Sequence, residues 1–136
     1  METHDMEMLW EQMGFIRWPI SFAALMIAAL SLYSTAQVYK PGAWANLKTK
    51  VFIDGVLFWG GFAVVAGLLG SVLGVIISFQ SIEQAGAVSP TIMAGGIKVA
   101  TLSSAAGLLI LAVASLIWFT LQFRWRMLQA KEAQEN

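Results

Sequence analysis

The middle of this chain contains the run Gly67-Leu68-Leu69-Gly70-Ser71-Val72-Leu73-Gly74-Val75-Ile76-Ile77-Ser78. It lies in a long apolar run, yet Gly67 and Gly74 recur seven residues apart, with Gly70 and Ser71 between them. In lipid a helix gains little by burying leucine, because the surrounding hydrocarbon is equally apolar, whereas small residues let another backbone approach closely. The stretch therefore predicts the packing face of a membrane helix.

A second stretch of small and hydroxyl-bearing residues follows in the last third of the chain. It contains Gly95, Gly96, Ala100, Thr101, Ser103, Ser104 and Gly107. Hydroxyl groups can form hydrogen bonds across a helix interface. Two such helices in one short chain predict an assembly with a polar surface between helices. The residues expected to pack the helices are Gly67, Gly70, Gly74, Gly96, Ala100 and Gly107.

The composition indicates a membrane protein. Of the 136 residues, 58% are hydrophobic and 12% are charged, whereas charged residues make up about a quarter of a soluble domain. Eight basic and eight acidic residues give zero net charge, so composition offers no support for nucleic-acid binding. Cysteine is absent, which excludes disulfide and thiolate chemistry, and the single histidine is His4 in the N-terminal tail. We expect neither a metal site nor a cofactor.

Three apolar runs exceed the length of about 18 residues that marks a membrane-spanning helix. The chain is therefore expected to be an all-α integral membrane protein. Its membrane domain would cover residues 16–122, with helices at about 16–39, 51–79 and 91–122. Residues 1–15 fit either an amphipathic segment at the membrane interface or a partly ordered polar tail, and residues 123–136 are expected to form a C-terminal tail.

Basic residues predict how the chain is oriented in the membrane. Three spans place the N-terminus and the 80–90 hairpin on one side and the 40–50 loop and the C-terminus on the other. The second side carries most of the basic residues, namely Lys40, Lys48, Lys50, Arg124, Arg126 and Lys131. Because basic residues favour the cytoplasmic side, we expect the N-terminus outside and the C-terminus in the cytoplasm.

The hydroxyl groups of the second and third helices have two interpretations. Ser71 and Ser104 lie at a similar depth, because the two helices are antiparallel and rise about 1.5 Å per residue. In the first interpretation the hydroxyls bond to their own backbone carbonyls and the small residues pack helices. In the second, several copies of the chain surround a passage whose pore-lining residues are Ser71, Ser78, Thr101 and Ser104, and weak dipoles solvate a proton carrier.

The second and third helices lack an acid that could carry a proton. No charged residue lies between Gly55 and Gln80, and Lys98 is the single charge between Thr91 and Leu121. Proton relays normally need a titratable group inside the membrane, so a different subunit would have to supply the carboxylate. The sequence also shows no nucleophile–base pair, metal cluster or phosphate-binding loop, and we therefore expect no enzymatic activity.

Residues 67–79 resemble the second conserved helix of the MotA/TolQ/ExbB proton channel family. That helix has the pattern Gly-Leu-hydrophobic-Gly-Thr-Val-x-Gly-Ile followed by a Phe, and here Phe79 closes the stretch. The downstream segment Ile92–Ile97, with Ala100 and Ser104–Leu108, resembles the family pattern Ala-x-Gly-Ile-x-x-Ala-Leu-x-x-Thr-x-x-Gly-Leu. The resemblance covers residues 55–120, and the predicted topology is similar to that of the ExbB and TolQ branch.

The resemblance implies a fold, a partner and a location. Members of this family form ring-like homopentamers in the bacterial inner membrane around two copies of a single-span partner resembling ExbD, TolR or MotB. The partner carries a membrane aspartate and a periplasmic domain, and the resemblance implies that proton flow rotates the pentamer around it. By position, Ser71 and Ser104 replace the family's two pore-facing threonines and keep the hydroxyl group.

Two departures from the family pattern leave two functional hypotheses. Val99 stands where the ExbB and TolQ branch usually has a glutamate, and the 40–50 loop replaces a large cytoplasmic domain. The first hypothesis is a channel-forming subunit of a proton-driven, energy-transducing inner-membrane complex, surrounding an ExbD- or TolR-like partner. The alternative is a non-conducting membrane scaffold that uses the same fold to hold a larger complex together.

Overall fold

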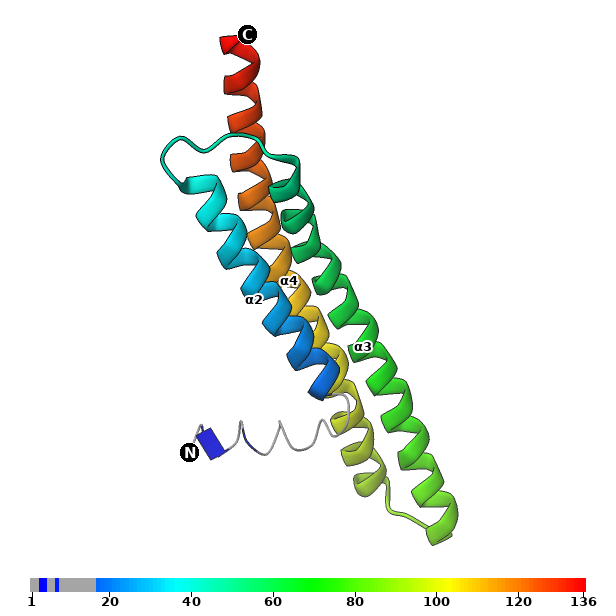
Figure 1. Ribbon diagram of the computed structural model, residues 1–136. Coiled ribbons are helices and arrows are strands. Elements are labelled where there is room, and N and C mark those ends of the chain that lie inside the picture. Colours follow the sequence, from blue (N-terminus) through cyan, green and yellow to red (C-terminus); the bar gives the residue numbers. More distant parts are fainter. Residues whose placement is uncertain (1–2, 5–6, 8–16) are drawn as a thin grey trace.

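The computed structural model describes residues 3–4, 7 and 17–136, and within this part the chain forms three long helices (Figure 1). They are α2 (Arg17–Tyr39), α3 (Leu47–Ala85) and α4 (Pro90–Glu135). Each helix is long and apolar enough to cross a membrane, so the prediction of an all-α protein with three potential spans is confirmed. The predicted interfacial segment 1–15 lies outside the described residues, apart from residues 3, 4 and 7.

Helices α3 and α4 are longer than a bilayer requires. With 39 and 46 residues, they extend about 58 and 69 Å, against a hydrocarbon core of about 30 Å. The predicted spans 51–79 and 91–122 lie inside them. Residues 123–135, predicted as part of a separate tail, continue α4 without a break, because this segment is rich in strong helix formers such as Gln, Ala, Lys, Glu, Met and Leu.

The ends of α3 and α4 are set by capping residues. The side chain of Asn46 accepts a hydrogen bond from the backbone N–H of Lys48 at 3.0 Å and so caps the start of α3. Gly86 ends α3 with a φ of 85°, which favours glycine, and donates its N–H to the carbonyl of Ile82. Ser89 then caps α4, which opens with Pro90 in its first turn. The turn between these caps makes α3 and α4 an antiparallel hairpin.

Helix α2 packs along one part of this hairpin (Figure 1). At its end near the α2–α3 connection, Val38 packs in a buried cluster with Ile53, Leu121, Trp125 and Leu128. Near its start, Ile20 packs on Ala66, which lies in the middle of α3. The part of the hairpin toward the 86–89 turn therefore extends beyond α2.

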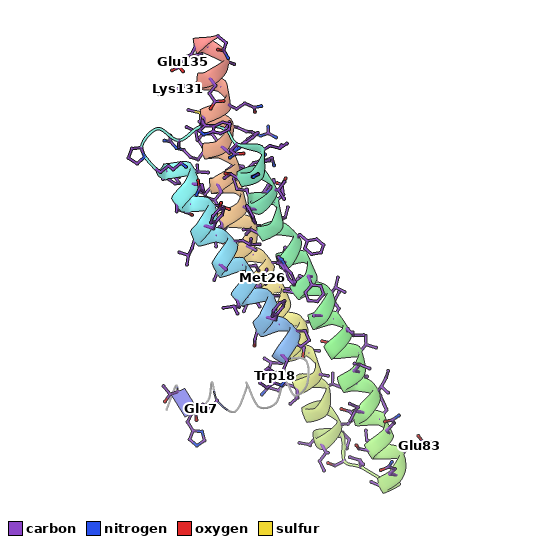
Figure 2. The ribbon with its side chains drawn as sticks, in the orientation of Figure 1. Glu7, Trp18, Met26, Glu83, Lys131 and Glu135 are labelled. Atoms are coloured by element: carbon purple, nitrogen blue, oxygen red, sulfur yellow. The ribbon has the colours of Figure 1, made fainter. Side chains whose placement is uncertain are left out.

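The surface of the three helices is largely apolar, and their charged residues, apart from Lys98, lie toward the ends of the helices. Figure 2 shows Glu83 near the hairpin turn and Lys131 and Glu135 at the opposite end of α4. Large apolar side chains are exposed along the helices between these ends, among them Leu25, Phe58, Leu69, Leu109, Leu116 and Phe119. A soluble monomer rarely exposes so much contiguous apolar surface, so lipid or other membrane helices must cover it.

Candidate functional site at the α3–α4 interface

Three glycines on α3 face α4 at intervals of seven residues. Gly60 lies against Ala114, Gly67 against Ser103, and Gly74 against Ala100. A Cβ added to Gly60 or Gly74 would lie 2.8 or 2.9 Å from the alanine Cβ opposite. A seven-residue repeat keeps one face of a helix toward its neighbour in left-handed packing. The glycines therefore bring α3 and α4 close together along the middle part of α3, from Gly60 to Gly74.

The two helices approach most closely where backbone meets backbone. A Cβ at Gly67 would overlap the carbonyl oxygen of Ser103, and a Cβ at Gly107 would lie 2.5 Å from the carbonyl oxygen of Ala63. These neighbours are backbone atoms, which cannot rotate out of the way as a side chain can. Of the residues predicted to pack helices, Gly67, Gly74, Gly96, Ala100 and Gly107 lie at this interface, and Gly70 is buried.

Ser71 and Ser104 meet between these close contacts. Their hydroxyl oxygens are 2.5 Å apart, and the Ser71 hydroxyl donates a hydrogen bond to the carbonyl of Ala100 at 2.7 Å. The backbone N–H of Ser104 also donates to the Ser71 hydroxyl, at 3.3 Å. The sequence left open whether one chain or neighbouring chains bring the two serines together. Helices α3 and α4 of a single chain do so.

The two hydroxyl groups can form hydrogen bonds in two alternative arrangements. When Ser71 donates to the Ala100 carbonyl, Ser104 donates to Ser71, because each hydroxyl has one proton. The Ser104 hydroxyl can instead donate to the carbonyl of Gly67, at 3.5 Å, and Ser71 can then donate to Ser104. The shorter distance to Ala100 favours the first arrangement. The pair can thus reverse its dipoles without moving a heavy atom.

Ser78 and Thr101 are placed differently from the central pair. The Ser78 hydroxyl donates to the Gly74 carbonyl of its own helix at 2.8 Å and lies against Gly96, where a Cβ would be 2.9 Å away. The Thr101 hydroxyl donates to the Lys98 carbonyl at 2.9 Å, on an exposed face of α4. Both therefore bond to their own backbone, while Ser71 and Ser104 bond across the interface.

A double-mutant cycle should measure the coupling between the central serines. We expect Ser71→Ala and Ser104→Ala to show a coupling energy between about 0.6 and 1.7 kcal/mol, the mean and the maximum for hydrogen bonds between membrane helices. The readout is the free energy of unfolding in mixed micelles. The cycle of Ser78→Ala with Ser104→Ala is the control and should be additive, because those side chains bond to different partners. Equal coupling in both cycles would contradict the structure.

The sequence profile of the MotA/TolQ/ExbB proton channel family matches residues 49–133. This region covers more than half of the chain. It includes Gly60, Gly67 and Gly74, which we call the glycine row, together with Ser71, Ser104 and the turn between the helices. The chain belongs to this family. Comparison with curated proteins and with solved structures found no match for it.

In this MotA/TolQ/ExbB family member the matched region begins in the first turn of α3 and ends near the end of α4. The family pattern therefore lies in the α3–α4 hairpin, and α2 lies outside it. The resemblance inferred from residues 67–79 is confirmed at the level of the family. The fold and the family together identify the chain as a multi-pass membrane protein of the proton-channel type.

Sequence reasoning missed two features of this hairpin. Gly60 was not predicted to pack helices, although it stands seven residues before Gly67 and extends the repeat of Gly67 and Gly74. The second feature is Asp54, which accepts hydrogen bonds from Lys50 at 2.6 Å and from the indole N–H of Trp118 at 3.1 Å. That contact joins α3 to α4, and no local sequence signal indicates it.

Proposed function

We propose that this MotA/TolQ/ExbB family member is the channel-forming subunit of a proton-driven complex in the bacterial inner membrane. A homopentamer of the chain would surround a single-span partner of the ExbD or TolR type, which carries an intramembrane aspartate and a periplasmic domain. The chain itself would be a non-enzymatic energy-transducing component, with its N-terminus outside and its C-terminus in the cytoplasm. The excess of basic residues at the α2–α3 connection and along the last turns of α4 supports this orientation.

The observation that carries the proposal is the Ser71–Ser104 hydroxyl pair within the family-matched hairpin. Hydroxyls donate and accept hydrogen bonds but hold no charge at neutral pH, so they can solvate a passing proton or a carboxylate without trapping it. The segment from Gly55 to Gln80 contains no titratable acid or base. The titrating group of a conducting complex would therefore come from the partner.

Replacing both serines with valine tests the channel role. The Ser71→Val, Ser104→Val variant removes both hydroxyls, and we expect proton uptake by vesicles containing the full complex to fall at least tenfold. The Ser71→Thr, Ser104→Thr variant is the matched control, because threonine has the shape of valine and keeps the hydroxyl. The threonine variant should retain most of the uptake, while the valine variant should still assemble. Unchanged uptake in the valine variant would rule out the channel role.

A non-conducting scaffold is the second candidate function. It is favoured by the way the hydroxyls are used: Ser71 and Ser104 bond to each other, and Ser78 and Thr101 bond to their own helices. In a scaffold these bonds would do no more than hold α3 and α4 together. A purified complex with lipid in its centre, or with no partner helix there, would support the scaffold function. Copurification of a single-span protein with a membrane aspartate would count against it.

A further inference from the structure

Lys98 places a charge on an apolar part of α4. It is exposed on the chain and is the single charged residue between Thr91 and Leu121. Gly96 lies against Ser78 and Ala100 against Gly74, so Lys98 lies between these two levels of the hairpin. It is eight residues from Pro90, or about 12 Å along the helix.

Lys98 has no carboxylate partner among the described residues. The ion pair that they contain joins Lys50 to Asp54 at the opposite end of α3. Glu83 lies beyond Ser78 toward the hairpin turn, about 10 Å further along the helix axis than Lys98. A charged side chain in an apolar membrane segment is costly, and such side chains pair with one another or with backbone carbonyls. We therefore expect the ammonium group of Lys98 to have a partner at the same height along the helix axis.

The face of α4 around Lys98 has the spacing of a helix-packing surface. Exposed residues follow at alternating intervals of four and three, in a set that we call the Lys98 row: Ala94, Lys98, Thr101, Ala105, Leu108 and Ala112. An average spacing of 3.5 residues is the repeat at which a second helix packs along the first. The alanines let its backbone approach closely. Neither α2 nor α3 covers this row, since Ala106 and Ile110 face α2, and Ala100 and Gly107 face α3.

We infer that the Lys98 row binds one membrane helix of another polypeptide, which carries a carboxylate that pairs with Lys98. The inference rests on the proposed function and deepens it, because it names the face and the residue that hold the partner. Lys98 is then a positioning residue: a charge-assisted hydrogen bond from its ammonium group sets the depth and rotation of the partner helix.

A second copy of this chain does not provide such a carboxylate from its described helices. In a ring, copies related by a rotation axis place equivalent residues at equal height. Asp54 and Glu132 would then lie toward the opposite end of the bundle from Lys98, and Glu83 would lie nearer the hairpin turn. Among the acids of α3 and α4, a neighbouring copy therefore offers none at the height of Lys98, which favours a carboxylate from a different polypeptide.

Carbodiimide cross-linking of the intact complex in its native membrane tests this inference. Dicyclohexylcarbodiimide enters the bilayer and activates a carboxyl group, and an amine within ion-pair distance then forms an amide bond and releases dicyclohexylurea. We expect mass spectrometry to find the peptide containing Lys98 joined to an acidic residue within an apolar segment of at least 18 residues in another chain. The yield should fall at least tenfold in Lys98→Met.

Two further variants separate the charge from the cross-linking chemistry. Lys98→Arg keeps the positive charge but forms no amide, so it should lose the cross-link and keep the partner through purification. Lys98→Met should lose both. Lys48→Met, which removes a lysine at the start of α3, is the control and should change neither.

Three results would overturn the inference. They are a cross-link from Lys98 to an acid of residues 1–16 of the same chain, loss of a bound anionic phospholipid as the sole effect of Lys98→Met, and equal recovery of the partner with Lys98→Met and Lys98→Arg. The serine variants distinguish this failure from failure of the proposed function. If the Ser71→Val, Ser104→Val variant loses proton uptake but no Lys98 cross-link forms, the channel role stands and the pairing of Lys98 is wrong. If the cross-link forms but proton uptake is unchanged in the valine variant, the pairing stands and the channel role is wrong.

Discussion

Alanine at position 67 is expected to lower the free energy of unfolding of the membrane domain by about 1–2 kcal/mol. The added Cβ would overlap the carbonyl oxygen of Ser103, and the atoms next to it, Ser103 C and Ser104 Cα, are backbone as well. Overpacking of an interior usually costs about 1–3 kcal/mol, and here α4 would have to shift as a whole. The higher helix propensity of alanine, worth about 1 kcal/mol, offsets only part of this cost.

Gly61→Ala is the matched control for Gly67→Ala. Gly61 is on the same helix, but a Cβ there would meet no atom of the described residues within 4 Å. The free energy of unfolding in mixed micelles, followed by tryptophan fluorescence, should be unchanged or rise for Gly61→Ala. If both alanine variants were equally stable, α3 and α4 could not be as close as the structure places them.

The same substitution should also disturb the serine pair. Gly67 and Ser71 are one helical turn apart on the face of α3 that contacts α4. Forcing the helices apart at Gly67 therefore lengthens the distance between the Ser71 and Ser104 hydroxyls. We expect the coupling energy of the Ser71–Ser104 cycle to fall toward zero in a Gly67→Ala background, while a Gly61→Ala background should leave it unchanged.

Trp125→Ala is expected to destabilise the opposite end of the bundle by about 3–5 kcal/mol, the range for removing a large aromatic residue from a core. The Trp125 side chain is 9% exposed and packs with Val38, Ile53, Leu121 and Leu128. Its indole N–H donates a hydrogen bond to the backbone carbonyl of Asn46 at 3.1 Å. Trp125 therefore connects α4 to α2, to α3 and to the connection between them.

Two variants separate the packing of Trp125 from its hydrogen bond. Trp125→Phe keeps an aromatic ring but loses the N–H, so it should cost less than half as much as Trp125→Ala. Trp44→Ala removes an indole that is 59% exposed and should change the free energy of unfolding by less than about 0.5 kcal/mol. The measurement is again unfolding in mixed micelles. A Trp44→Ala variant as unstable as Trp125→Ala would contradict the burial of the two side chains.

Much of the helical structure could be predicted because membrane spans depend on local composition. Apolar length identified all three helices, and the spacing of Gly67 and Gly74 identified the face of α3 that packs. Residues 123–136 were expected to form a C-terminal tail after the third span, and α4 continues through this tail as far as Glu135. Helix propensity, rather than hydropathy, decides where a helix ends outside the membrane.

Residue type and the 3.6-residue period of one helix were enough to predict the family, the three apolar helices and the small-residue faces. The packing of α4 on α3 was needed to show that Ser71 bonds to Ser104 within a single chain, that Gly60 extends the repeat of Gly67 and Gly74, and that Trp118 contacts Asp54. These contacts depend on the register of α4 along α3. A shift of α4 along α3 by one residue, about 1.5 Å, would leave every pattern in the sequence unchanged and break each of these contacts.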